Sequence, residues 1–72
     1  MHIEIYSKTG CAQCDEAERI VQATEHTYNK LMLDNDFTRD QLFEIFPTAR
    51  TFPQIMVDGN AIGGLQQLKE VL

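Results

Sequence analysis

The chain has 72 residues, 43% of them apolar, and its 11 acidic and 6 basic side chains give a net charge of −5. This length suits a single domain over residues 1–72 with a small core, and the acidic excess argues against a surface that binds nucleic acid or an anionic membrane. No apolar run approaches the roughly 20 residues that cross a bilayer, and the first residues lack the pattern of a signal peptide. A cytoplasmic protein is therefore expected.

Apolar patterns divide the chain into seven elements. Ile3 and Ile5 share one face of a first strand, and an apolar stripe at positions i, i+3, i+4 and i+7 begins at Ala17 in the helix that follows. Thr38 and Gln41 have the spacing of a capping box at the start of a second helix. In chain order we predict strand 2–6, helix 12–24, strand 27–33, helix 38–46, strands 54–58 and 60–62, and a last helix opened by Gly63-Gly64.

The order of these elements predicts the fold. A strand–helix–strand unit implies two parallel strands joined by a right-handed crossover, and Asp58-Gly59 predicts a hairpin between the last two strands. The economical arrangement is an α/β fold of order β-α-β-α-β-β-α, with a mixed four-stranded sheet and helices on both faces. The residues expected in the buried helical stripes are Ala17, Ile20, Val21, Thr24, Leu42, Ile45, Phe46, Leu65, Leu68, Val71 and Leu72.

The two cysteines, Cys11 and Cys14, form a Cys-x-x-Cys motif between the first strand and the first helix. Residues at i and i+3 of one helical turn lie close enough for a disulfide, but so short a loop adds little stability, which favours a redox role. The helix N-terminus favours a thiolate, whereas the carboxylates of Asp15 and Glu16 would raise the thiol pKa. We predict that Cys11 is the exposed nucleophile and Cys14 the more buried, resolving thiol.

Three segments together resemble the glutaredoxins, within the thioredoxin-fold superfamily. They are Lys8-Thr9-Gly10-Cys11-Ala12-Gln13-Cys14, Arg50-Thr51-Phe52-Pro53-Gln54 and Gly63-Gly64-Leu65. The resemblance covers nearly the whole chain and implies a thioredoxin-like fold. It also implies a monomeric thiol–disulfide oxidoreductase that uses glutathione as co-substrate and reduces disulfide-containing proteins, with ribonucleotide reductase as one expected partner. No metal is expected.

The same resemblance implies a glutathione site around the dithiol. Lys8 would lower the pKa of the thiol beside it and, with Arg50, would pair with the glycine-end carboxylate. Pro53 would be a cis-proline that leaves the backbone of Phe52 free to pair with the cysteine part of glutathione, and Gly63-Gly64 would bring the backbone close to the γ-glutamyl end. The full set of glutathione-binding residues implied in this way is Lys8, Cys11, Gln13, Arg50, Thr51, Phe52, Pro53, Gly63, Gly64, Leu65 and Gln66.

Two departures from the family pattern leave alternatives open. Gln66 and Gln67 stand where many glutaredoxins carry an aspartate or a hydroxyl residue that binds the γ-glutamyl end of glutathione. A side-chain amide has no charge with which to pair the ammonium of that end. Ala12-Gln13 replaces the common Pro-Tyr pair between the cysteines. The alternatives are a redoxin reduced by thioredoxin reductase, a dimer that shares a glutathione-ligated [2Fe–2S] cluster through Cys11, and an interaction module without redox activity.

Overall fold

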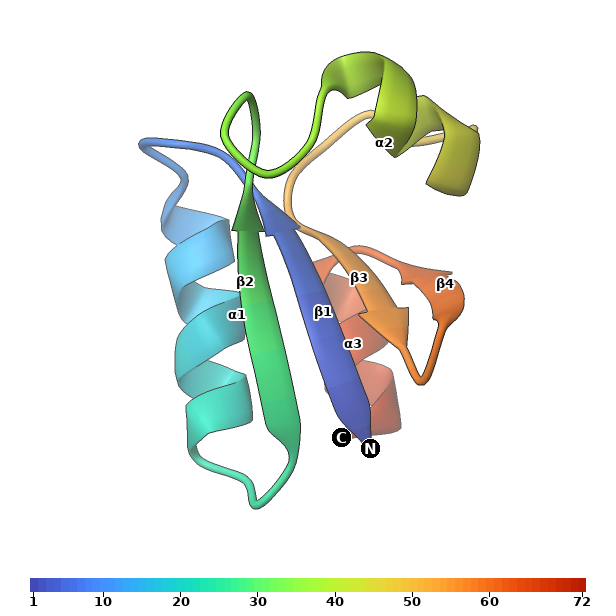
Figure 1. Cartoon of the computed structure of the whole chain (residues 1–72). Helices are drawn as coiled ribbons and strands as arrows, with labels where there is room; N and C mark the ends of the chain where they lie inside the picture. Colours follow the sequence, from blue (N-terminus) through green and yellow to red (C-terminus); the bar gives the residue numbers. More distant parts are fainter.

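The computed structural model describes all 72 residues of the chain, and its elements follow the predicted order (Figure 1). They are β1 (His2–Ser7), α1 (Ala12–Gln22), β2 (Thr27–Met32), α2 (Arg39–Ile45), β3 (Gln54–Val57), β4 (Asn60–Gly63) and α3 (Leu65–Val71). None of the three helices has the length and apolar character needed to span a membrane.

The four strands form one mixed sheet in the order β2-β1-β3-β4. Strand β1 pairs in parallel with β2, as the strand–helix–strand unit predicts, and antiparallel with β3, which in turn pairs antiparallel with β4. The predicted α/β fold and its order are therefore confirmed. Strand β1 lies inside the sheet, between β2 and β3. The loop that follows Ser7 leads from this strand into α1 and includes Gly10, whose φ is +69°.

The sheet has a separate core cluster on each face. The side chains of β1 alternate between the two, so that Ile5 packs toward α1 and α3 whereas Tyr6 packs toward α2. The buried residues of the first cluster are Ile3, Ile5, Ala17, Val21, Ile55 and Leu68. Those of the second are Tyr6, Phe37, Leu42 and Phe46, where the ring of Tyr6 meets those of Phe37 and Phe46 edge-on at centroid distances of 5.0 and 5.4 Å.

The helix boundaries follow from local hydrogen bonds. The hydroxyl of Thr38 accepts from the backbone N–H of Gln41 at 3.2 Å, and the Gln41 side chain accepts from the Thr38 N–H at 2.8 Å, so the predicted capping box is confirmed. The predicted helix 12–24 is two residues too long, because α1 ends at Gln22 and the Thr24 hydroxyl donates to the Val21 carbonyl at 2.6 Å.

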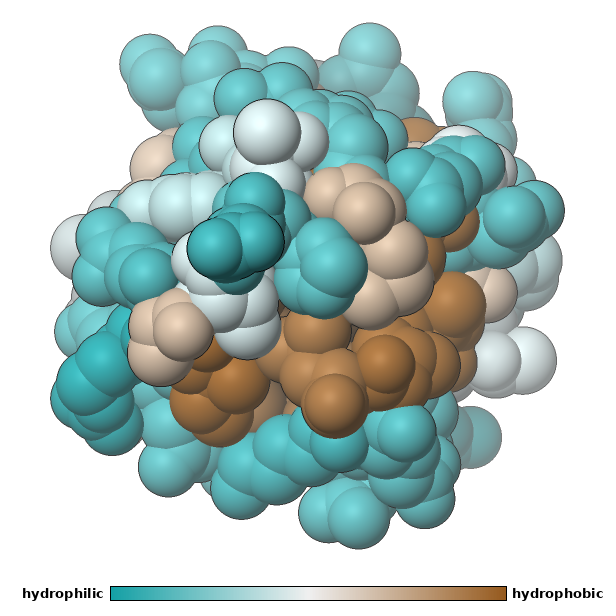
Figure 2. Space-filling model, turned by 90° about the horizontal axis from the view of Figure 1, so that it is seen from below, coloured by the Kyte–Doolittle hydropathy of each residue, from teal (hydrophilic) through white to brown (hydrophobic).

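Two predicted core residues, Val71 and Leu72, lie on the surface. Their exposed fractions are 45% and 41%, because the last turn of α3 lies at the end of the sheet where β1 begins and no further layer covers it. The two termini lie at this same end of the molecule (Figure 1), and Met1 is also 42% exposed. The view from below shows the apolar surface that gathers there (Figure 2).

Candidate active site

The dithiol lies at the start of α1, immediately after the central strand. Cys11 is the N-cap residue and forms a disulfide with Cys14, and its Sγ accepts a hydrogen bond from the Cys14 backbone N–H at 3.1 Å. Cys14 is fully buried, whereas Cys11 is partly exposed. A thiolate on Cys11 would receive the same N–H donor and the positive end of the α1 dipole, both of which stabilise negative charge.

The segment before β3 lies against the dithiol. The Phe52–Pro53 peptide bond is cis, as predicted from the Thr-Phe-Pro context, and the Phe52 carbonyl oxygen lies 3.8 Å from Cys11 Sγ. Pro53 is buried, and the buried Gln54 donates its side-chain amide to the Thr51 carbonyl at 2.8 Å, which fixes the turn that presents Phe52. The Lys8 ammonium lies 5.6 Å from the centre of the Phe52 ring, a cation–π geometry.

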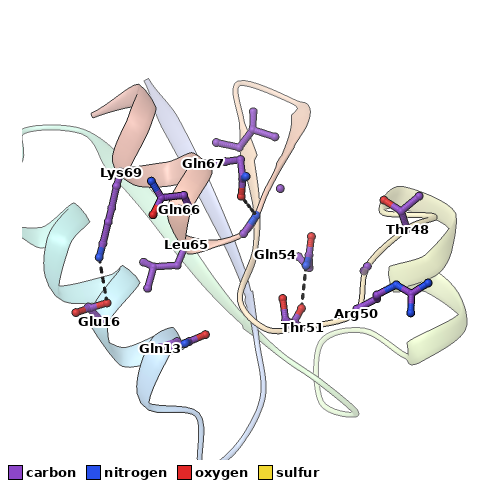
Figure 3. A pocket seen from close by; sticks show the side chains of 14 residues that line it. Gln13, Glu16, Thr48, Arg50, Thr51, Gln54, Leu65, Gln66, Gln67 and Lys69 are labelled. Carbon is purple, nitrogen blue, oxygen red and sulfur yellow. Dashed lines mark hydrogen bonds and ion pairs between the residues drawn. The ribbon is translucent and has the colours of Figure 1, made fainter.

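A polar groove of about 690 Å³ opens beside the dithiol (Figure 3). Three segments build it: the first turns of α1, the loop between α2 and β3, and the β4–α3 junction. In Figure 3, Arg50 stands on the loop across the groove from Gln66 and Lys69 of α3. The lining residues are Gln13, Glu16, Thr48, Ala49, Arg50, Thr51, Gln54, Ile62, Gly63, Gly64, Leu65, Gln66, Gln67 and Lys69.

The groove brings together most of the residues expected to bind glutathione. Seven of them line it: Gln13, Arg50, Thr51, Gly63, Gly64, Leu65 and Gln66. The remaining four, Lys8, Cys11, Phe52 and Pro53, lie outside that lining and form a second group, in which Cys11 and Lys8 both contact Phe52. The β4–α3 junction joins the two groups, because Gly64 packs against the Pro53 carbonyl so closely that a Cβ there would lie 3.4 Å from it.

Seven lining residues are not among the predicted glutathione-binding residues, and two of them, Gln67 and Lys69, make interactions that hold the groove together. The Gln67 side-chain oxygen accepts a hydrogen bond from the Gly64 backbone N–H at 2.9 Å, so this amide holds the entry to α3. The Lys69 ammonium pairs with Glu16 of α1 at 3.6 Å and ties the two helices together across the groove. Gln67 follows Gly64 by three residues, the spacing of a capping interaction, which is the signal that indicates its role.

The carboxylates that follow the dithiol are paired with lysines from other elements. Lys30 of β2 reaches Asp15 at 3.1 Å and Glu18 at 3.2 Å, and the hydrogen bond to Asp15, followed by the contact with Glu18, raises the pKa of Lys30. Glu16 is the partner of Lys69. The negative potential that Asp15 and Glu16 exert on Cys11 is therefore partly offset by two neighbouring ammonium groups.

The fold and site define a class of protein. A dithiol at the start of α1, facing a cis-proline beside a β-α-β-α-β-β-α sheet, is the arrangement of a thioredoxin-like thiol–disulfide oxidoreductase. Within that class, the model of the Glutaredoxin family matches residues 3–62, and the chain belongs to this family.

Individual relatives agree with that assignment. Glutaredoxin 3 of Escherichia coli K12 is 27% identical over 67 residues, which cover 93% of this chain and 81% of the relative. The dithiolic glutaredoxin of Trypanosoma brucei brucei is 29% identical with a TM-score of 0.75, covering 96% of this chain and 74% of that one. A buckwheat glutaredoxin–glutathione complex has the same fold, with a TM-score of 0.79 and 24% identity over 94% of this chain and 64% of that one.

Proposed function

We propose that this glutaredoxin is a glutathione-dependent oxidoreductase that reduces glutathione mixed disulfides and protein disulfides. The observation that supports it is the polar groove, which starts at the Cys-x-x-Cys turn of α1 and carries unpaired Arg50 at its far side. Glutathione is a short, polar, doubly carboxylated peptide, so a groove that is polar, elongated and open suits it better than it suits an apolar ligand. The buckwheat glutaredoxin, which shares the fold, forms a complex with glutathione.

The bound tripeptide would lie across the groove with its sulfur at Cys11. Its glycine-end carboxylate would meet Arg50, which pairs with no carboxylate of the protein. Its central peptide would follow the backbone of Phe52 beside the cis bond, as an added strand does. Its γ-glutamyl end would reach the β4–α3 junction at Gly64 and Gln66, the opposite wall of the groove.

Reduction of a glutathione mixed disulfide needs only Cys11. Its thiolate attacks the glutathione sulfur; a Cys11–glutathione disulfide forms, the old S–S bond breaks, and the substrate leaves as a thiolate that takes a proton from solvent. The thiolate of a second glutathione then attacks the glutathione sulfur of this mixed disulfide, which releases oxidised glutathione and restores the Cys11 thiolate. The Cys14 N–H and the α1 N-terminus stabilise that thiolate before each cycle.

Reduction of a protein disulfide needs both sulfurs. Cys11 attacks one substrate sulfur, and the buried Cys14, held in the same helical turn, then attacks Cys11 and displaces the reduced substrate. Two glutathione molecules return the Cys11–Cys14 disulfide to the dithiol. The burial of Cys14 keeps it away from external disulfides, which assigns the first attack to Cys11.

A coupled NADPH-oxidation assay tests this proposal. The substrate is the mixed disulfide of glutathione with 2-mercaptoethanol, supplied either with glutathione and glutathione reductase or with thioredoxin reductase alone. We expect turnover with glutathione. Turnover with thioredoxin reductase alone would overturn the glutathione dependence, and no turnover with either donor would overturn the proposed substrates.

Two variants then separate the roles of the cysteines. Cys11→Ser should lose both activities, whereas Cys14→Ser should keep turnover of the glutathione mixed disulfide and lose reduction of a protein disulfide such as insulin. Ala61→Ser, an exposed position on β4 away from the groove, is the matched control for introducing a serine. Equal loss of both activities in Cys14→Ser would contradict the division of roles.

A further inference from the structure

The charges that line the groove bear on which part of a ligand it recognises. Three of the fourteen lining side chains are charged: Glu16, Arg50 and Lys69. Glutathione carries two carboxylates and one ammonium, and its ammonium belongs to the γ-glutamyl end. Under the proposed function, on which this inference rests, that ammonium needs a carboxylate or another strong acceptor if the protein is to select for it.

The one carboxylate of the groove is already engaged. Glu16 pairs with Lys69 at 3.6 Å, and both are only partly exposed, with 38% and 47% of their side chains accessible. A ligand ammonium would have to compete with an ammonium that belongs to the protein. Arg50, by contrast, has no ion-pair partner, and its guanidinium is free to donate hydrogen bonds to a ligand carboxylate.

Two neutral acceptors of the groove already receive a hydrogen bond from the protein. The Gln67 side-chain oxygen is taken by the Gly64 N–H at 2.9 Å, and the Thr51 carbonyl is taken by the Gln54 amide at 2.8 Å (Figure 3). Gln13 and Gln66 line the groove without a hydrogen-bond partner in the protein, and each offers an uncharged amide. A hydrogen bond between neutral groups is roughly half as strong as one assisted by charge.

We infer that the groove selects its substrates by their carboxylates and does not discriminate for the α-ammonium of the γ-glutamyl end. The substrate class is then broader than glutathione: disulfides of carboxylate-bearing peptide thiols, including those whose amine is acylated. Gln66 is the specificity-determining residue, because it is the lining amide without a hydrogen-bond partner on the β4–α3 wall, where the γ-glutamyl end lies under the proposed function.

The test is a single-turnover reaction of the fully reduced protein with chromogenic mixed disulfides. Each substrate joins 2-nitro-5-thiobenzoate to glutathione, to N-acetylglutathione or to glutathione amidated at its glycine end. The Cys11 thiolate attacks the peptide sulfur, and the nitrothiobenzoate, which is the better leaving group because its thiol pKa is lower, departs as a coloured thiolate. Cys14 then displaces the peptide thiol, so the protein dithiol supplies both electrons.

We expect the second-order rate constants for the glutathione and N-acetylglutathione substrates to agree within about threefold, whereas loss of the glycine-end charge should slow the reaction about tenfold, as expected for a charge-assisted hydrogen bond. A rate at least about tenfold lower for the N-acetyl substrate would overturn the inference and leave the proposed function intact. The reference is the reaction of each peptide substrate with a small thiol of the same pKa in solution. If the protein reacts no faster than this thiol with any of the peptide substrates, the proposed function itself fails.

An isosteric variant tests the assignment of Gln66 directly. Gln66→Glu places a carboxylate in the groove and should make the glutathione substrate react several-fold faster than the N-acetyl substrate. Asn60→Asp adds the same charge to an exposed strand position outside the groove and should leave the ratio of the two rates unchanged. Equal ratios in Gln66→Glu and Asn60→Asp, with both variants folded by circular dichroism, would overturn the role of Gln66.

Discussion

Replacing Gly63 by alanine should destabilise the protein through two effects that can be measured separately. Gly63 has a φ of +121°, a region that side chains rarely adopt, and a Cβ there would lie 2.9 Å from the Gln67 side chain. The backbone strain costs about 1–3 kcal/mol. The contact itself is relieved when Gln67 rotates away, but that rotation breaks the hydrogen bond to Gly64, which adds about 0.5–1.5 kcal/mol.

The expected loss of unfolding free energy for Gly63→Ala is therefore roughly 1.5–4.5 kcal/mol. A domain of this size has a total stability of about 4–11 kcal/mol, and each kcal/mol shifts Tm by about 4–8 °C. The variant should unfold at a Tm lower by roughly 6–36 °C. Urea unfolding followed by circular dichroism gives the free energy, and a thermal scan gives Tm.

Gly59→Ala is the matched control for the backbone effect. Gly59 also has a positive φ, +84°, but no atom lies within 4 Å of a Cβ built there, so this variant should lose only about 1–2 kcal/mol. In a Gln67→Ala background the additional cost of Gly63→Ala should fall by about 1 kcal/mol, because the side chain that it displaces is gone. A Gly63→Ala loss no larger than that of Gly59→Ala would refute this reasoning.

Three further substitutions test the core and the titrating groups. Leu68→Ala removes a fully buried side chain that attaches α3 to the sheet, and urea unfolding should show a loss of about 2–5 kcal/mol; a loss under about 1 kcal/mol would contradict this packing. Lys30→Met should cost about 1 kcal/mol at pH 7 by removing the ion pairs with Asp15 and Glu18. Because those contacts raise the pKa of Lys30 above 10.5, their contribution is complete below that pH and is lost above it, so the stability curves of wild type and variant should converge at higher pH. Burial raises the pKa of Tyr6 above 10.0, so the folded state retains the phenol proton longer than the unfolded chain; wild-type stability should fall above pH 10.0, and Tyr6→Phe should fall less steeply over the same range.

The fold was predictable because its signals are local and periodic. The alternation of Ile3 and Ile5 and the Thr38–Gln41 capping box agree with the structure. The stripe that begins at Ala17 is confirmed as far as Val21, because α1 ends before Thr24. The same reasoning was wrong for Val71 and Leu72, because a helical stripe indicates which face of α3 is apolar but not how far the sheet beneath it extends.

The candidate site was predictable only in part, for a related reason. Motifs located Arg50, Gly64 and the cysteines, but Thr48 and Ala49 enter the groove through the path of a loop that has no periodic pattern. The ion pairs of Lys30 and Lys69 join elements that are distant in sequence, and they depend on how α1 packs against β2 and α3. Charge pairing of this kind becomes visible only after the elements are assembled.

The position of the two termini has a practical consequence. Both ends of the chain lie at the end of the molecule where β1 begins (Figure 1). Cys11 follows the opposite end of that strand, which finishes at Ser7. A tag, a surface linker or a partner domain fused to either end would therefore project away from the dithiol and leave the groove open to substrate.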